Sequence, residues 1–193
     1  MYKFCKTEQS AARQRELEQG LLQIMSTLRY EDINVSDLCQ KMGIPRKSFY
    51  RYFSSKDGAL HALIDHTLME YESFGGNRIT RVSRTLHGDL KSFFEFWIQH
   101  EKLLNALERS SMSGVLIERS ISYAASEAVF PSRFLPGEDK SIRQHVVMFA
   151  VCGLMTMVLQ WHHGGYQESA SDMAVVAARL VTQPLFPNAS HLL

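Results

Sequence analysis

Cysteine, proline and long apolar runs are all scarce in this chain of 193 residues. The three cysteines, Cys5, Cys39 and Cys152, have neither the spacing of a metal site nor the number of a disulfide framework, which is typical of a reducing cytoplasm. The longest apolar run, 146–159, is 14 residues long, and a membrane-spanning helix needs about 20. No apolar run follows the first lysines, so we expect no signal peptide. The sequence therefore predicts a cytoplasmic protein without a membrane partner.

Residue groups suited to catalysis or metal binding are also missing from the sequence. His162 and His163 are adjacent, so on a helix they point about 100° apart. His61 and His66 are five residues apart, and neither pair has a carboxylate at a metal-binding spacing. The sequence has no nucleophile elbow, glycine-rich phosphate loop or CxxC. We expect no enzyme, metal or cofactor; an enzyme on a helical scaffold would need a polar cleft with perturbed titratable groups.

Charge of one sign is not abundant either, because the formal net charge is only +1. This balance excludes a uniformly basic nucleic-acid coat. The distribution is uneven: residues 1–58 contain ten Lys and Arg against seven Asp and Glu, and the remainder contains 11 against 13. A small basic unit followed by a larger, neutral to acidic one suits a DNA-reading head on a separate body. We predict a DNA-binding domain over 1–56 and a second helical domain over 57–193.

Apolar residues recur three or four positions apart through almost the whole chain, and the alternation typical of strands is absent. The sequence therefore predicts an all-α protein. The expected helices lie at about 9–28, 34–42, 45–53, 54–75, 86–107 (as one helix or two), 112–130, 141–163 and 171–185.

Local signals predict where the second, third and fourth helices begin and end. Asn34 is a candidate N-cap, with Asp37 three residues later completing a pair like a capping box. Gly43 suits the position after a helix, where φ is often positive. Pro45 suits the first turn of the next helix, and Ser54 is the expected N-cap of the fourth.

The segment 43–56, GIPRKSFYRYFSSK, combines an apolar helix face with a cationic one. Phe49 and Phe53 share a face at about 100° per residue, and we assign both to the core. The other side carries cations, and no acidic residue occurs between Asp37 and Asp57. A helix, a short turn with glycine and a second helix with outward cations predict a helix-turn-helix. The alternative is a basic helix that only faces solvent.

The run 33–60, INVSDLCQKMGIPRKSFYRYFSSKDGAL, resembles the DNA-binding domain of the tetracycline-repressor (TetR) family. The resemblance covers about residues 10–65, and its most specific parts are 34–38, 43–44, the aromatic cluster 49–53 and Lys56. It implies an N-terminal three-helix head with a helix-turn-helix, followed by a C-terminal helical bundle for ligand binding and dimerisation.

The same resemblance implies roles for individual residues in DNA binding. Contacts with the DNA backbone are implied for Ser36, Tyr50, Tyr52 and Lys56, and contacts with base edges for Arg46, Lys47 and Ser48. Two positions depart from the family pattern: Pro45 stands where Ser or Thr is usual, and Gly58 where an acidic residue is usual. The first departure puts one backbone contact near this turn in doubt. The second puts the stability of the first turn of the fourth helix in doubt.

The C-terminal run 153–180 resembles the ending of one branch of the same family. There the last two helices form a four-helix bundle with their symmetry mates, so the resemblance implies a homodimer. Small residues permit a close helix crossing, and the alternative is a core within one chain. The predicted interface residues are Gly153, Met157, Trp161, Ala174, Ala178 and Val181.

Residues 85–135 align with no motif, and in the family this region shapes a ligand cavity. The candidate lining residues are Phe93, Trp97, His100, Leu104, Met112, Leu116, Tyr123, Phe130 and Met148. Aromatic and methionine side chains at helical spacing also form ordinary cores, so plain packing remains the alternative. The set contains no cluster of Arg or Lys, so we predict an apolar or amphipathic effector.

These features together predict a homodimeric transcriptional regulator. The leading interpretation is a repressor that binds an inverted-repeat, double-stranded DNA operator and is released by an unknown small molecule. The alternative keeps the fold and the DNA binding but gives the helical body a protein partner, so that the chain acts as a co-activator or constitutive regulator.

Overall fold

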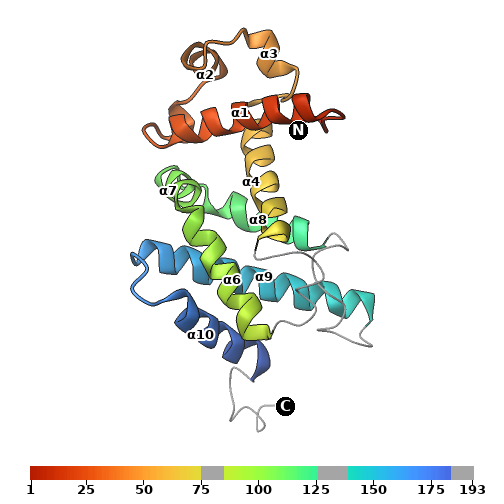
Figure 1. Cartoon of the computed structure of the whole chain (residues 1–193), viewed down its shortest axis with the longest axis vertical. Coiled ribbons are helices and arrows are strands. Elements are labelled where there is room, and N and C mark those ends of the chain that lie inside the picture. Colours follow the sequence, from red (N-terminus) through yellow and green to blue (C-terminus); the bar gives the residue numbers. More distant parts are fainter. Residues whose placement is uncertain (75–84, 126–138, 184–193) are drawn as a thin grey trace. The chain divides into compact units, whose positions relative to one another are not determined.

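The computed structural model describes residues 1–74, 85–125 and 139–183 (Figure 1). These residues are mostly helical, and the predicted all-α fold is confirmed. They also include a short 3-10 helix, η1 (Tyr30–Asp32), and an isolated antiparallel bridge between Tyr2 and Phe53. The helices are α1 (Glu8–Met25), α2 (Val35–Lys41), α3 (Arg46–Tyr50), α4 (Lys56–Ser73), α6 (Leu86–Gln99), α7 (Glu101–Arg109), α8 (Ser113–Ala125), α9 (Lys140–His163) and α10 (Ala170–Thr182).

Helices α1 and α3 end earlier than predicted, whereas the segment 86–107 matches one of its two predicted forms. Helix α3 ends at Tyr50 instead of Phe53, because Phe53 leaves the helix to pair with Tyr2. Helix α1 ends at Met25, and Leu28 lies beyond it, 37% exposed. The segment 86–107 forms two helices, which meet at His100, where φ is −102° and ψ is 21°.

The chain divides into two compact units. The first comprises Met1–Glu70 with Glu101–Tyr123, and the second comprises Tyr71–His100 with Ala124–Leu193. The first unit therefore holds most of α4 and α8 as well as the helix-turn-helix. The predicted boundary between residues 56 and 57 separates a DNA-binding domain from the rest of the chain, and it stays a prediction.

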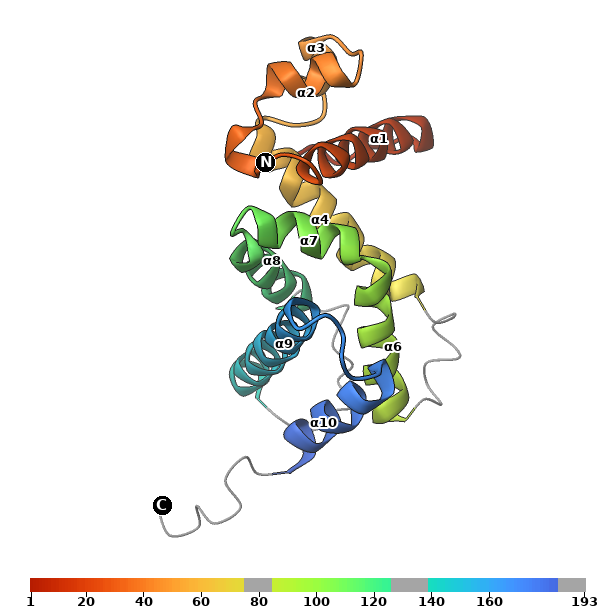
Figure 2. The ribbon, with the colours of Figure 1, turned by 90° about the vertical axis from the view of Figure 1, so that its left-hand side faces the viewer.

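The core of the first unit forms where α1 packs against α2 and α7, and α2 against α3. Figure 2 shows α2 and α3 at one end of this unit, beyond α1 and α4. The central side chains are fully buried and come from every one of these elements: Leu17, Leu21, Met25, Leu38, Phe49, Phe53, Leu60, Ile64, Leu103 and Leu107.

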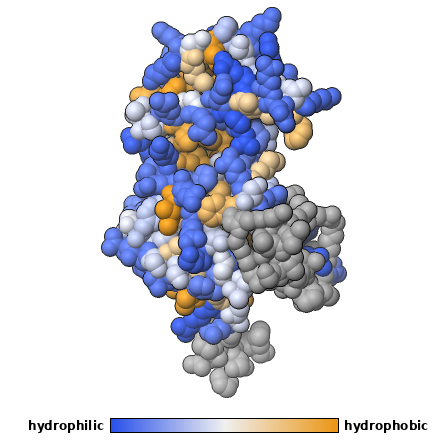
Figure 3. All heavy atoms as spheres, in the orientation of Figure 1, coloured by the Kyte–Doolittle hydropathy of each residue, from blue (hydrophilic) through white to orange (hydrophobic). Residues whose placement is uncertain are grey.

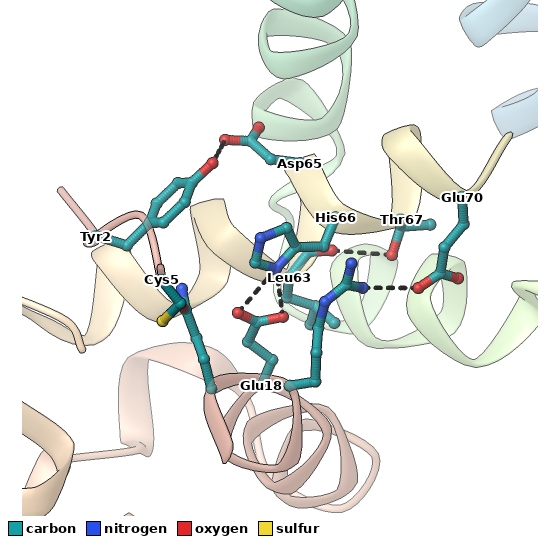
Figure 4. A network of polar contacts seen from close by, with 10 residues as sticks. Tyr2, Cys5, Glu18, Leu63, Asp65, His66, Thr67 and Glu70 are labelled. Atoms are coloured by element: carbon teal, nitrogen blue, oxygen red, sulfur yellow. Dashed lines mark hydrogen bonds and ion pairs between the residues drawn. The ribbon is translucent and has the colours of Figure 1, made fainter. Parts of the chain in front are cut away.

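A polar network fixes α4 inside the first unit (Figure 4). Nδ1 of His66 lies 2.9 Å from Oε2 of the buried Glu18 on α1. The Tyr2 hydroxyl donates to Asp65 at 2.7 Å. Nε of Arg119 on α8 donates to the same carboxylate at 2.7 Å, and a second nitrogen of that guanidinium completes a bidentate pair. Buried polar groups that are fully paired specify one arrangement of the elements that carry them.

The core of the second unit forms where α6 packs against α10. The fully buried Phe94 meets Trp161 of α9 edge to face, with ring centroids 5.5 Å apart. The indole of Trp161 donates to the Glu168 carbonyl at 3.1 Å, which fixes the turn between α9 and α10. Helix α10 then begins with a capping box between Ser169 and Asp172.

Candidate nucleic-acid interface

The turn between α2 and α3 has the geometry that the sequence predicts. The Asn34 side chain accepts from the Asp37 N–H at 2.9 Å and caps α2. Gly43 has φ +62°, a left-handed conformation that glycine adopts without steric cost. Pro45 directly precedes α3, and its carbonyl accepts from the Ser48 N–H at 2.8 Å. The turn therefore sets the direction of α3 through backbone geometry.

Helix α3 is anchored by one face and exposes the other. Phe49 and Phe53 are buried with ring centroids 5.2 Å apart, and their assignment to the core is confirmed. Arg46, Lys47 and Arg51 are exposed. Figure 3 shows mainly hydrophilic side chains in the part of the first unit where α2 and α3 lie. A cationic helix face held by a buried apolar one suits a groove lined with phosphate and base edges.

Arg46 and Tyr50 form a pair on this exposed face. The guanidinium carbon of Arg46 lies 5.8 Å from the centroid of the Tyr50 ring, and Nη2 donates to the Tyr50 hydroxyl at 3.4 Å. This hydrogen bond raises the pKa of Arg46, so the group stays charged. Tyr50 is 43% exposed, so its side chain is accessible to a partner.

The other three predicted contact residues near α3 differ in accessibility. Ser36 is exposed at the start of α2, and Ser48 is half-buried. Tyr52 is only 7% exposed, because it follows α3 and packs into the core. Its carbonyl accepts from the Lys3 N–H at 2.9 Å. A DNA contact by the Tyr52 side chain is thus a prediction that its burial does not favour.

Lys56 is half-buried and already binds the protein. Its ammonium donates to the carbonyls of Tyr30 at 2.6 Å and Ile33 at 2.5 Å, and lies 4.1 Å from the centroid of the Tyr30 ring. The Tyr30 hydroxyl donates to Asp57 at 2.6 Å. Burial, and after it this hydrogen bond, raises the pKa of Tyr30. A lysine ammonium has three N–H donors. Two of them hold η1 against the start of α4, so a phosphate would take the third.

The sequence analysis placed the N-cap of α4 at the wrong serine. It also missed that the first residues of the chain pack against the start of α4. Ser55, and not Ser54, accepts from the Gly58 N–H, at 3.1 Å. The Ser54 hydroxyl instead donates to the Met1 carbonyl at 2.7 Å. A Cβ at position 58 would lie 2.5 Å from that carbonyl oxygen, so glycine leaves room for the first residues of the chain. The glycine at position 58, which departs from the family pattern, was the one sequence signal of this close approach.

The candidate ligand-lining residues are divided between the two units. Leu104, Met112, Leu116 and Tyr123 belong to the first unit, and Phe93, Trp97, His100 and Met148 to the second. Leu104, Leu116 and Trp97 are buried, Met148 is exposed on α9, and the others are half-buried. Phe130 lies outside the described residues.

The candidate dimer residues also differ in exposure. Gly153 and Val181 are exposed, and Met157 and Ala178 are half-buried. Trp161 and Ala174 are buried within their own chain. Across Ser141–His163, α9 is long and apolar enough to cross a membrane by length and composition, with mean hydropathy 1.6 and 22% of that window buried. One such helix among the described residues is weak evidence for a membrane span, because helices of soluble proteins can have the same length and composition.

Comparison with known proteins finds a likeness to transcriptional regulators. No family model matches it. The HTH-type transcriptional regulator EthR of Mycolicibacterium smegmatis is 30% identical over 81 residues, which are 40% of this chain and 37% of that protein. The chain thus matches little more than a third of that relative's length.

Two solved structures show the same fold along nearly the whole chain. The dihydroxyacetone kinase operon activator DhaS has a TM-score of 0.57 at 13% identity, covering 88% of this chain and 93% of its own. The fatty acid degradation regulator FadR from Bacillus halodurans has a TM-score of 0.55 at 13% identity, covering 94% and 98%. The fold is that of helical transcriptional regulators. EthR is a TetR-family regulator, so the predicted resemblance to that family is confirmed.

Proposed function

We propose that this chain is a cytoplasmic, DNA-binding transcriptional regulator that acts as a homodimer on an inverted-repeat operator and responds to a small apolar or amphipathic molecule. The observation that carries the proposal is the exposed face of α3. Arg46, Lys47 and Arg51 point away from a core held by Phe49. The likeness to EthR, a transcriptional regulator, supports the same reading.

DNA binding is tested by selecting duplexes from a randomised library and titrating the recovered sequence. We expect submicromolar affinity and an inverted repeat. A dimer that neutralises about 6–10 phosphates should lose roughly 10³–10⁵ in affinity between 50 and 200 mM salt. Arg46→Ala should reduce discrimination at one defined base pair by about 1–3 kcal/mol. Lys102→Ala, which removes an exposed lysine of α7, is the matched control. Failure to recover any preferred duplex would contradict the proposal.

The homodimer is supported by a stripe of exposed residues along α9. Positions spaced alternately by four and three face solvent, and a Cβ at Gly153 would meet nothing within 4 Å. Phe149, near the middle, is 66% exposed. Helix α10 adds Val175, Val176, Leu180 and Val181, which are all exposed. The α9 stripe comprises Ile142, Val146, Phe149, Gly153, Thr156 and Gln160.

This stripe has the spacing of a helix–helix interface. Apolar side chains at alternating intervals of four and three form the seam of paired helices. Contiguous exposed apolar surface on a folded chain marks an interaction site. A second copy of the same chain would cover the stripe with an identical one, as a two-fold interface requires. Gly153 would then lie where the two α9 helices cross most closely.

The effector is supported by an aromatic cluster in the second unit. The cluster comprises Tyr71, Phe93, Phe96, Trp97 and His100, with neighbouring ring centroids 4.1–6.4 Å apart. The indole N–H of Trp97 is buried and has no hydrogen-bond partner among the described residues. A buried donor without a partner costs about 1–3 kcal/mol. A ligand with an apolar body and one hydrogen-bond acceptor would satisfy it.

The effector is tested by thermal shift with a panel of fatty acids, long-chain alcohols and aromatic ketones. We expect one class to raise the melting temperature and to weaken operator binding. Trp97→Phe keeps an aromatic ring, although a smaller one, and removes the donor, so it should reduce that response. If no compound shifts the melting temperature while the DNA titration succeeds, the alternative of a protein partner on the helical body gains support. The sign of regulation is tested separately by a reporter assay.

A further inference from the structure

The first six residues, Met1–Lys6, form an extended segment docked on the link between α3 and α4; we call it the N-terminal segment. The Lys3 N–H donates to the Tyr52 carbonyl at 2.9 Å, and the Ser54 N–H donates to the Met1 carbonyl at 3.0 Å. Between these bonds, Tyr2 pairs with Phe53 as an antiparallel bridge. The segment is therefore fixed by its backbone to the residues that directly follow α3.

Side-chain contacts from α4 hold the same segment. The Tyr2 hydroxyl reaches Asp65 (Figure 4). Arg119 pairs with the same carboxylate. Gly58 lies directly under the Met1 backbone, where any larger residue would collide. Figure 1 shows the N-terminus beside the end of α1, in the unit that carries α3. The start of α4 is thus shaped around this segment, next to the helix proposed to read DNA.

The side chains that the segment leaves exposed differ from those it buries. Tyr2 faces the protein, whereas Lys3, Phe4 and Lys6 are exposed, and Phe4 is 87% exposed. Residues 1–6 contain no acidic residue. An aromatic side chain held in solvent between two cations, on an anchored backbone, is suited to a partner that is anionic and has an apolar interior.

We propose that the N-terminal segment is a second DNA contact, in which Lys3 and Lys6 bind phosphates and Phe4 enters the minor groove beside the major groove read by α3. The inference rests on the proposed function. DNA meets both requirements of the segment, because its phosphates bind cations and its minor groove admits apolar side chains as wedges between base steps. The exposed cations of α3 give the adjoining surface the same charge.

The test uses the full chain and a duplex recovered by selection. Replacing both lysines, Lys3→Ala with Lys6→Ala, should flatten the slope of log affinity against log salt by about 1.8 per protomer, since each phosphate contact contributes about 0.9. Phe4→Ala should weaken binding at least about fivefold with little change in that slope, the low end of an aromatic contact with bases. Lys102→Ala again serves as the control. Gly58→Ala should reproduce part of both losses by displacing the segment.

The outcomes separate this inference from the proposed function. If the wild type binds no selected duplex, both are overturned. If it binds, but the segment variants keep its affinity and salt slope, only the role of the segment is overturned. A minor-groove-binding polyamide should compete with the wild type more than with Phe4→Ala; equal competition overturns the minor-groove placement. Lysine-dependent binding to anionic phosphatidylserine vesicles, with unchanged DNA affinity, would assign the segment to a membrane surface instead.

Discussion

The two units expose helix faces of opposite chemistry, on α3 in the first and on α9 in the second. On α3 Phe49 is buried and the exposed side chains are two cations and Tyr50, whereas on α9 a mainly apolar stripe faces solvent. A cationic helix face is well solvated when it is unbound, and it attracts a polyanion electrostatically. Burying an apolar stripe away from water is favourable by about 25 cal/mol of free energy for each Å² buried. The difference therefore suits the two roles proposed for these surfaces, DNA binding for α3 and pairing with a second copy of the chain for α9.

The largest effect should come from the buried charges that hold the first unit together. Asp65→Ala leaves the Arg119 guanidinium and the Tyr2 hydroxyl without their shared acceptor. Breaking a buried ion pair costs about 3–5 kcal/mol, and the partial exposure of Arg119 favours the lower end. Chemical denaturation measures this loss. Glu95→Ala breaks the exposed Lys91–Glu95 pair on α6 and should cost at most about 1 kcal/mol. Equal losses would show that the network is not a main constraint on the first unit.

The second prediction tests the apolar stripe of α9. Gly153→Leu fills the space where two stripes would cross, and overpacking typically costs about 1–3 kcal/mol. We expect the dimer to dissociate at protein concentrations where the wild type does not, as measured by light scattering. Met69→Leu, at an exposed apolar position on α4, should leave assembly unchanged. A wild-type chain that is monomeric at micromolar concentration would refute the proposed interface.

The third prediction compares two lysines of the first unit. Lys47 is exposed, whereas Lys56 donates to the carbonyls of Tyr30 and Ile33. Lys56→Ala should flatten the salt slope by about 0.9 for each site if Lys56 meets one phosphate. Lys47→Ala should instead reduce discrimination at a defined base pair, by about 1–3 kcal/mol. Only Lys56→Ala should also lower stability, by about 1.5–3 kcal/mol for lost hydrogen bonds to a charged group. A DNA titration and a thermal melt on both variants distinguish the roles. An unchanged salt slope for Lys56→Ala would mean that Lys56 only supports the fold.

Most of the fold follows from local sequence signals, but the site depends on contacts between distant residues. Apolar periodicity located the helices, and the Asn34 cap and the positive φ of Gly43 are set by neighbouring residues. In contrast, Phe53 leaves α3 early because it pairs with Tyr2, 51 positions away in sequence. Pairing of this kind leaves no periodic signal. The Asp65–Arg119 pair likewise joins residues 54 apart.

Family resemblance has a related limit, which Lys56 and Gly58 illustrate. The resemblance implies a phosphate contact for Lys56, yet it does not report that two N–H groups of this lysine bind carbonyls. It marks Gly58 as unusual without a reason, and the reason is the Met1 backbone lying against it. A motif identifies which residue types share a position. The geometry around that position depends on what this particular chain packs there.

The smallest effect concerns two adjacent serines at the start of α4. Ser55 accepts from the Gly58 N–H, and Ser54 donates to the Met1 carbonyl. Replacing an N-cap serine with alanine typically costs about 1 kcal/mol, so Ser55→Ala should lower the free energy of unfolding by that amount. Ser54→Ala removes an exposed hydrogen bond and should leave stability within about 0.5 kcal/mol. It should nevertheless loosen the N-terminal segment, seen as faster amide exchange at Lys3. Because the serines are neighbours of equal size, each is the control for the other. A larger loss of stability for Ser54→Ala than for Ser55→Ala would indicate that Ser54 is the N-cap, as the sequence predicts. It would also contradict the contact between the N-terminal segment and the start of α4.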